Sequence, residues 1–385
     1  MKQVLHGFPV YSGITRTVVL SLFILMLFVS LMAPPGICMS IRDPKDSIAN
    51  LSFNHDGKKV VFDRCRNEGC QIQVYNLETG ELAAYQSPQN ERWTMGKYSY
   101  DGKKIAFSVI PIKPNDELDL GAMQIAVMDA DGKNYKKVTT GPGAKLYPAF
   151  SHNGKKILYA CAAQIREKGR TPAAQYDAWE VNLETGQQTQ LTFFKYYYMG
   201  SLAYFPDDER FIFDGDMPTA FPGLEPTKAN PLDNQEMSKQ GRIKNAIPIS
   251  GVVAMKRGDT LPRENFNFGE KFFAKKPLLS KDGSKLIVEK DISGGDFYLY
   301  SPDGNHRLVG GGGSVKSAAV SPDGKLLGMI ATSIHIFEVQ DGKRKVILYL
   351  PSTPKITQNW DNAYRGSENL YKMIPEKPSY FINKL

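Results

Sequence analysis

The sequence predicts an all-β fold: a six-bladed β-propeller of four-stranded antiparallel blades, preceded by an N-terminal signal or anchor segment. Three observations support this prediction. A turn motif is written six times along the chain, each copy lies between short apolar runs, and the copies recur at intervals of roughly 45 residues. Of the 385 residues, 42% are apolar and 23% are charged, a balance that allows a large core.

The repeated motif is an Asp-Gly or Asn-Gly pair that follows one short apolar strand and precedes lysines and a second apolar strand. The six copies occupy residues 49–62, 96–107, 147–159, 202–213, 276–288 and 317–330. Asp-Gly and Asn-Gly tolerate the positive φ that type I′ and related tight turns require, so each copy is predicted to be a β-hairpin. A third strand and a second turn follow each copy, and a fourth strand is seen at 136–140 and 189–193.

A lone four-stranded sheet would leave both faces in water, so the units are expected to stack face to face in a closed ring. The expected blades are 48–90, 91–141, 142–194, 195–268, 269–311 and 312–350, within a propeller spanning 41–350. Residues 351–385 are too short for another blade, but they contain Trp360 and several tyrosines. This C-terminal tail is therefore expected to dock on the propeller, where it could cover an edge strand.

Several repeat phrases resemble those of a known family. SPDGK at 321–325, SPDG at 301–304 and VNLETGQQTQLT at 181–192 are similar to the repeat of TolB-like propellers, a branch related to the WD-repeat propellers. The resemblance covers nearly all of the chain after residue 40. It implies a propeller that presents one face to a protein. TolB also has an amino-terminal α/β domain, whereas the first blade here follows the N-terminal segment almost directly.

The first 40 residues have the composition of an export segment. Residues 18–33 form an uncharged apolar run after Lys2 and Arg16, the order typical of a secretory signal. The run is slightly shorter than the roughly 20 residues that span a bilayer, which favours cleavage. Retention as a membrane tether and lipidation at Cys38 remain alternatives. The sequence thus predicts a periplasmic or other extracytoplasmic location.

Export permits disulfide bonds. Cys65 and Cys70 flank RNEG between two predicted strands, which places them within reach of a disulfide, and two free thiols are the alternative. A zinc site is disfavoured because no CxxC pair and no nearby histidine supplies the other ligands.

The formal net charge is +8, from 48 basic and 40 acidic residues. The lysines recur just after the repeated turn, as at Lys58, Lys103 and Lys155. They are therefore interpreted as solvated hairpin flanks, and no nucleic-acid partner is predicted, since such a surface needs clustered basic and aromatic residues.

The long insertions are predicted to share one face of the ring, the face of the loops between second and third strands. In blades 2, 3 and 4 these loops span 111–122, 162–177 and 215–250. Loops longer than about 15 residues are often functional, so we expect this face to bind a protein partner in the cell envelope. The expected partner-binding residues are Asp116, Glu117, Asp119, Arg166, Lys168, Arg170, Asp216, Phe221, Lys239 and Arg242.

Catalytic motifs are not evident. The chain has five histidines and no GxSxG motif, and His55 and His152 occupy equivalent positions beside a turn, which indicates a structural role. Residues 115–121 could bind Ca²⁺ as an alternative, although their spacing does not match an EF-hand. We therefore predict no catalytic residues, metal or cofactor, and a monomeric, non-catalytic binding or scaffold protein. The alternative is a polysaccharide-acting propeller enzyme such as an oligosaccharide lyase.

Overall fold

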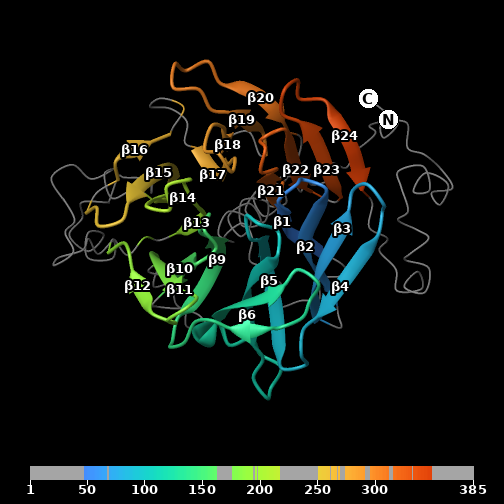
Figure 1. The fold of residues 1–385 in the computed structure, drawn as a ribbon, viewed down its shortest axis with the longest axis vertical. Helices are drawn as coiled ribbons and strands as arrows, with labels where there is room; N and C mark the ends of the chain where they lie inside the picture. The colour runs from blue at the N-terminus through green and yellow to red at the C-terminus, as the bar shows by residue number, and fades with distance from the viewer. Residues whose placement is uncertain are drawn as a thin grey trace, which may run out of the picture.

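The computed structural model forms six four-stranded antiparallel sheets around a common axis, which confirms the predicted six-bladed propeller (Figure 1). The described residues are 47–66, 69–162, 176–193, 196, 198–216, 250–260, 262–266, 268, 274–290, 295–311, 315–331 and 333–348. In every sheet the strands are neighbours in chain order, so each blade is a meander.

The strands of blades 1 to 3 are β1 (Ser47–Phe53), β2 (Lys59–Arg66), β3 (Gly69–Asn76), β4 (Leu82–Gln86), β5 (Glu91–Tyr98), β6 (Lys104–Pro111), β7 (Gln124–Asp129), β8 (Lys136–Lys137), β9 (Ala144–Phe150), β10 (Lys156–Ala162), β11 (Tyr176–Asn182) and β12 (Gln188–Gln190). The strands of blades 4 to 6 are β13 (Met199–Tyr204), β14 (Arg210–Asp216), β15 (Ser250–Lys256), β16 (Glu264–Asn265), β17 (Ala274–Leu279), β18 (Leu286–Lys290), β19 (Phe297–Leu299), β20 (Arg307–Gly310), β21 (Ser317–Val320), β22 (Leu326–Ile330), β23 (Ile334–Glu338) and β24 (Arg344–Leu348). A single 3₁₀ turn, η1 (Leu120–Ala122), precedes β7.

The turns between first and second strands are longer than the predicted two-residue type. In blade 2 the N–H of Ser99 donates to the carbonyl of Lys104 at 2.9 Å, so four residues, 100–103, lie between the two bonded residues. Gly102 has a φ of 72° and Asp101 does not have a positive φ, which excludes a type I′ turn. The Ser99 hydroxyl explains the difference, because it donates to Asp101 at 2.6 Å and accepts from the N–H of Lys104 at 3.0 Å.

Both kinds of turn within a blade lie on one face of the ring, here called the turn face. The loops between second and third strands and the connections between blades lie on the opposite, loop face. Turn-face lysines pair with acids of the second turn, as Lys58 does with Glu78 at 2.9 Å and Lys155 with Glu184 at 3.4 Å. These pairs balance the charges of Lys58 and Lys155.

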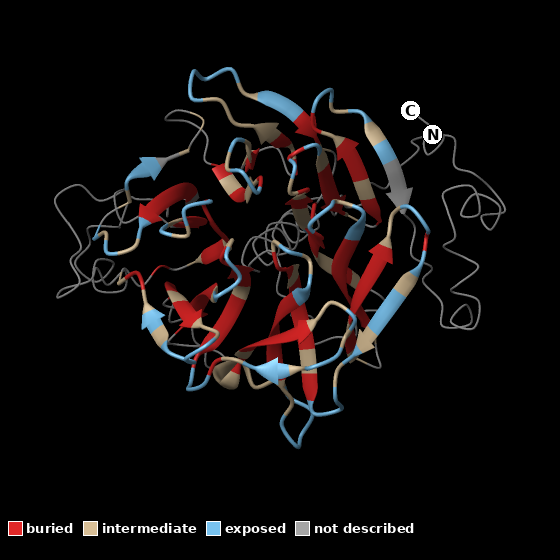
Figure 2. Cartoon of the chain, viewed as in Figure 1, coloured by how far each residue is buried: buried red, intermediate tan, exposed pale blue. Residues whose placement is uncertain are grey.

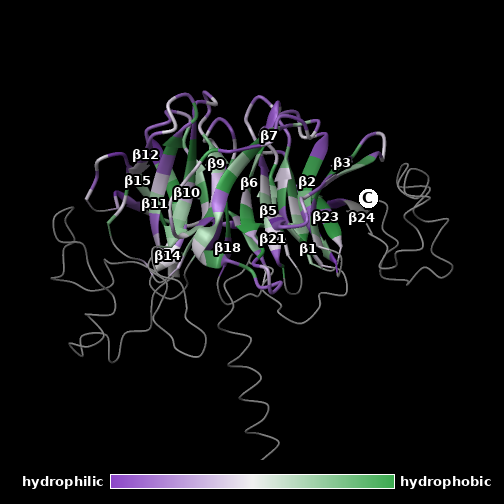
Figure 3. Cartoon of the chain, turned by 90° about the horizontal axis from the view of Figure 1, so that it is seen from below, coloured by the Kyte–Doolittle hydropathy of each residue, from purple (hydrophilic) through white to green (hydrophobic). Residues whose placement is uncertain are grey.

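The core lies between neighbouring blades. Figure 2 shows buried residues in the inner strands and exposed residues at the rim, and Figure 3 shows hydrophilic turns beyond hydrophobic strands. In blade 1 the second strand β2 is buried over six consecutive residues, whereas the rim strand β4 has no buried residue. Such strands are buried on both faces because each sheet packs against two others.

Blade 1 packs directly against blade 6 to close the ring. All four strands of each blade come from one continuous segment, so no strand is exchanged at the closure. Leu51 and Phe53 of β1 pack in one apolar cluster with Ala319, Ile330 and Ile336. The N–H of Leu51 also donates to the Ser317 hydroxyl at 2.9 Å. Ring closure therefore depends on side-chain packing between the first and last blades.

Both ends of the chain lie outside the described residues, and with them residues 18–33, Cys38 and the tail expected to dock on the ring. Within the ranges that the structure describes, no helix is long and apolar enough to cross a membrane.

The structure contains a disulfide bond between Cys65 and Cys70, which face each other across β2 and β3. Closing a loop of this length should stabilise the folded state by about 2 kcal/mol, because it restricts the unfolded chain. We expect the double variant Cys65→Ser/Cys70→Ser to lose that amount in denaturant unfolding. A reductant should weaken the wild type equally and leave the variant unchanged; equal stability of the two oxidised proteins would contradict this expectation.

Candidate functional site

The inner strands of blades 1 to 5 each carry one residue with a positive φ near the middle of the strand. These residues are Asn50 (57°), Met95 (62°), Tyr147 (55°), Ser201 (51°) and Lys276 (47°). The pairing register shifts by one residue at each position, as in a β-bulge. A positive φ is unfavourable for residues other than glycine, so something must stabilise it at five equivalent positions.

Asp63 of blade 1 stabilises the bulge of blade 2. Its carboxylate accepts hydrogen bonds from the N–H groups of Met95 at 2.6 Å and Gly96 at 3.2 Å. The hydroxyl of Thr94 donates to it at 2.6 Å, and the Asn50 amide of the first bulge donates at 2.5 Å. One buried carboxylate thus connects two neighbouring bulges.

Asp214 has the equivalent position in blade 4 and accepts from the N–H of Lys276 in blade 5 at 3.1 Å. Tyr147 and Tyr198 both lie close enough to Asp214 to interact with it electrostatically. Burial raises the pKa of both tyrosines, so they are neutral hydroxyls at physiological pH. The Lys276 ammonium pairs with Glu289 at 2.8 Å.

The buried carboxyl groups of Asp63 and Asp214 should make the stability of the fold depend on pH. Burial raises the pKa of both carboxyl groups from 3.8 to about 6, although the hydrogen bonds they accept act in the opposite direction. Because the folded-state pKa exceeds the unfolded-state value, protonation favours the folded state. The resulting stability, on the order of 3 kcal/mol per group, is full below about pH 4 and is lost as the pH rises to about 6.

We expect Asp63→Asn and Asp214→Asn each to remove one such contribution. The measurement is denaturant unfolding between pH 4 and pH 8, with each variant compared to the wild type at every pH. Curves that run parallel between pH 4 and pH 6 would contradict the assignment.

The bulges surround a cavity of about 100 Å³ on the propeller axis, to which all six blades contribute. Its lining residues are Asn50, Leu51, Met95, Gly96, Lys97, Tyr147, Pro148, Tyr198, Ser201, Leu202, Lys276, Pro277, Leu278, Lys316, Ser317 and Ala318. Among the described residues, the lining holds three lysines and no carboxylate, histidine or cysteine. This axial cavity is the candidate functional site.

Three side chains connect blades across the turn-face end of the axis. The Lys281 ammonium of blade 5 donates to the carbonyl of Tyr100 in blade 2 at 3.0 Å. Blades 2 and 5 are opposite in a ring of six, so this bond crosses the axis. The Tyr100 ring stacks on His152 at 3.8 Å, and His152 Nε2 lies 2.9 Å from the Lys281 carbonyl. We call Tyr100, His152 and Lys281 the turn-face plug.

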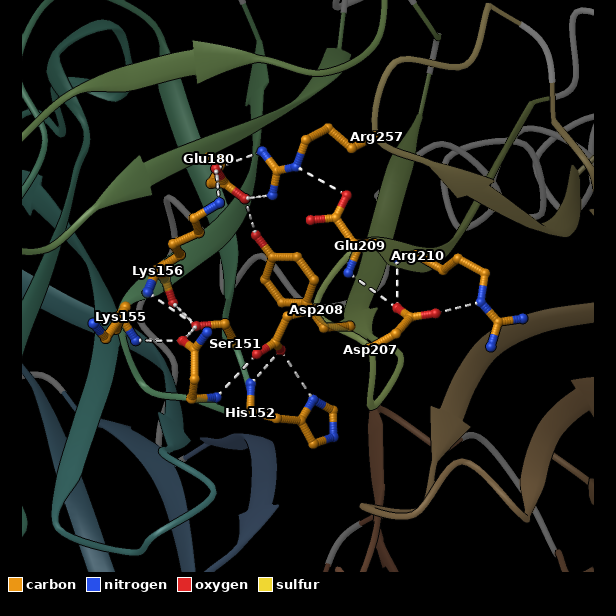
Figure 4. Close-up of polar contacts among 12 residues, drawn as sticks. Ser151, His152, Lys155, Lys156, Glu180, Asp207, Asp208, Glu209, Arg210 and Arg257 are labelled. Carbon is orange, nitrogen blue, oxygen red and sulfur yellow. Dashed lines mark hydrogen bonds and ion pairs between the residues drawn. The ribbon is translucent and has the colours of Figure 1, made fainter.

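Asp208 holds His152 in the plug (Figure 4). Its carboxylate accepts from the N–H groups of His152 at 2.5 Å and Asn153 at 3.1 Å. Asp208 has a φ of 55° at a turn position that is glycine in the other five repeats. The two hydrogen bonds to the carboxylate compensate for that backbone conformation. His152 thus has the structural role predicted from its place beside the turn.

A second polar network joins blades 3 and 4 (Figure 4). Glu180 is 5% exposed and accepts from Arg257 Nη1 at 2.7 Å and from the hydroxyl of Tyr204 at 2.5 Å. The Lys156 ammonium lies 3.2 Å from the same carboxylate. This network supports the walls around the axis and does not line the cavity.

The structure places few of the sequence-predicted partner-binding residues. Asp116 and Glu117 are exposed and Asp119 is half-buried, in a loop where Ile112 bridges to Leu118. In the described part of the chain no three His, Cys, Asp or Glu residues are arranged to hold a metal. Asp216 ends β14, and nothing is described of its side chain. Arg166, Lys168, Arg170, Phe221, Lys239 and Arg242 lie outside the described residues.

Sequence analysis missed the axial lysines and tyrosines. Tyr147 and Lys276 could have been found as polar residues four positions before the residue that starts the turn, whereas Lys97, Lys316 and Tyr198 do not share this spacing. An inner strand packed between sheets should be apolar there unless the side chain faces a cavity.

No protein-family model matches the chain, and no curated protein matches it. Solved structures do match. TolB from Acinetobacter baumannii superposes with a TM-score of 0.50 at 17% sequence identity, over 77% of this chain and 62% of that chain. The chain therefore shares the propeller fold of TolB. It spans about 62% of the length of that TolB chain.

Other propellers superpose to a similar degree. The structure of a nidogen/laminin complex matches with a TM-score of 0.50 at 10% identity, over 79% of this chain and 94% of that chain. An oligogalacturonate lyase from Vibrio parahaemolyticus matches with a TM-score of 0.46 at 14% identity, over 78% and 77%. Identities this low show a shared fold alone, and the function must be argued from the site.

Proposed function

We propose that the chain is an exported, non-catalytic binding protein that binds a protein partner on its loop face and takes one side chain of that partner into its axial cavity. The observation that carries this proposal is the lining, in which Leu51, Leu202 and Leu278 lie beside lysines from three blades. Apolar and charged groups side by side suit a peptide, whose side chains are of both kinds.

The loop face is the proposed side of approach. The turn-face plug crosses the axis at one end, which leaves the loop-face end for entry, and lining residues such as Asn50, Tyr147 and Lys276 lie near the middle of their strands. The long loops of blades 2 to 4 lie on the same side, so they would surround the bound partner. The apolar run at 18–33 supports export to the cell envelope, where this partner would be found.

The shared fold with TolB and with the nidogen/laminin complex is compatible with this function. The described residues of the cavity lining include no carboxylate or histidine, which also supports binding over acid–base catalysis. The oligosaccharide-lyase alternative predicts turnover of oligogalacturonides by the purified chain. Such turnover would overturn the proposal.

Photo-crosslinking in cells tests the proposal directly. A photoreactive residue in place of Lys316, which lines the cavity, should yield an adduct with one short segment of a single envelope protein. The matched control is the same residue in place of Lys345, which is exposed on the rim strand β24. Adducts from the rim position alone, or from neither position, would contradict a partner in the axial cavity.

A further inference from the structure

We propose that the axial cavity binds a carboxylate group of its ligand on the ammonium groups of Lys97 and Lys316. The inference rests on the proposed function, because the cavity is the one assigned to the partner's side chain. It names the chemistry that the partner must present there.

The first observation is that several other lysines of the ring, including the third lysine of the lining, already have counter-charges. On the turn face, Lys58 and Lys155 pair with glutamates. Within the cavity, Lys276 pairs with Glu289 at 2.8 Å and also donates to the Val315 carbonyl at 3.0 Å. A bound anion would add little to these lysines, whose charge is already balanced.

Lys97 and Lys316 differ. The Lys97 ammonium donates to the carbonyl of Leu202 at 3.2 Å, and in the described ranges no carboxylate pairs with it or with Lys316. An ammonium group has three donors, so Lys97 keeps two for a ligand. Burial lowers the pKa of Lys97 to about 8, which shows how costly its charge is without an anion nearby.

The two lysines also reach the cavity from different sides. Lys97 lies on the inner strand of blade 2, and Lys316 directly precedes the inner strand of blade 6. Both line the same cavity of about 100 Å³, which is small enough to confine one acidic group between them. Lys316 is exposed and Lys97 is half-buried, so an entering carboxylate would meet Lys316 first.

Two sources supply such a carboxylate: the acidic residues of a peptide and the uronic acids of a polysaccharide. We favour the peptide, because the cavity also has leucine side chains. The probes are a synthetic glutamate-containing peptide with its glutamine counterpart, and trigalacturonate with a neutral galactose trisaccharide. Binding to the full chain is measured by calorimetry.

We expect the glutamate peptide to bind at least about tenfold more tightly than the glutamine peptide, as for a charge-assisted hydrogen bond. Lys97→Met and Lys316→Met should each weaken the glutamate peptide about tenfold. Lys155→Met removes an equal charge from the turn face and should leave the affinity for the glutamate peptide unchanged. Melting curves show whether each variant folds. If Lys97→Met does not fold, Lys316→Met still tests the site. Wild-type affinity should also fall above about pH 8, where Lys97 loses its proton.

The outcomes separate the two proposals. Equal binding of both peptides would overturn the carboxylate site while leaving a protein partner in place. Lysine-dependent binding of trigalacturonate alone would support the carboxylate site and overturn the protein partner. Acidic probes that bind equally to wild type, Lys97→Met and Lys316→Met would overturn the site assigned here.

Discussion

Replacing Asp63 by alanine is expected to lower the free energy of unfolding by about 3–4 kcal/mol at neutral pH. The substitution leaves the N–H groups of Met95 and Gly96 and the hydroxyl of Thr94 buried without their acceptor. Each lost acceptor costs about 1–3 kcal/mol, partly offset because the charged carboxylate is itself costly to bury. Denaturant unfolding of the purified variant measures the loss.

The same substitution should weaken ligand binding. Met95 and Gly96 directly precede Lys97, so a bulge without its acceptor would no longer hold Lys97 toward the axis. Asp63→Asn is the control, because its single amide oxygen can still accept the hydrogen bond from the N–H of Met95, although the one from Gly96 is lost, and it should cost less than alanine. An alanine variant as stable as the wild type would show that the bulge needs no carboxylate.

Replacing Glu180 by alanine should have a comparable effect, a loss of about 3 kcal/mol. The change leaves the Arg257 guanidinium without its bidentate partner and the hydroxyl of Tyr204, a fully buried residue, without an acceptor. Removing one member of a partly buried ion pair costs far more than removing a surface pair, because the remaining charge is poorly solvated.

Glu184→Ala is the matched control for Glu180→Ala. Glu184 pairs with Lys155 at 3.4 Å, but its side chain is 65% exposed, so we expect a change of less than about 0.5 kcal/mol. Thermal and denaturant unfolding of the two variants in parallel measure the difference. Equal losses of stability in the two variants would indicate that burial of the network between blades 3 and 4 does not contribute to stability.

The architecture could be predicted from sequence because its determinants are local. Each hairpin is specified by a few adjacent residues, such as Ser99, Asp101 and Gly102, and the motif repeats along the chain. The turn type was predicted less well. The Ser99 hydroxyl adds hydrogen bonds that lengthen the loop, and the dipeptide Asp-Gly does not reveal this.

The candidate site could not be predicted in the same way, because its determinants lie in different blades. The bulge at Met95 depends on Asp63, and that at Lys276 depends on Asp214, and each pair is far apart in sequence. Lys97 likewise resembles the solvated turn lysines in the sequence, although its ammonium bonds to a carbonyl of blade 4. Only the closed ring brings these groups together.

Lysine footprinting is the most direct test of the axial site. The wild-type chain is treated with an amine-reactive reagent, alone and in complex with the partner identified by crosslinking at position 316. Modification of each lysine is followed by mass spectrometry. We expect Lys97 and Lys316 to become protected in the complex, while Lys58 and Lys155 react as in the free chain. Unchanged reactivity of Lys97 and Lys316, with protection of the turn-face lysines instead, would contradict it.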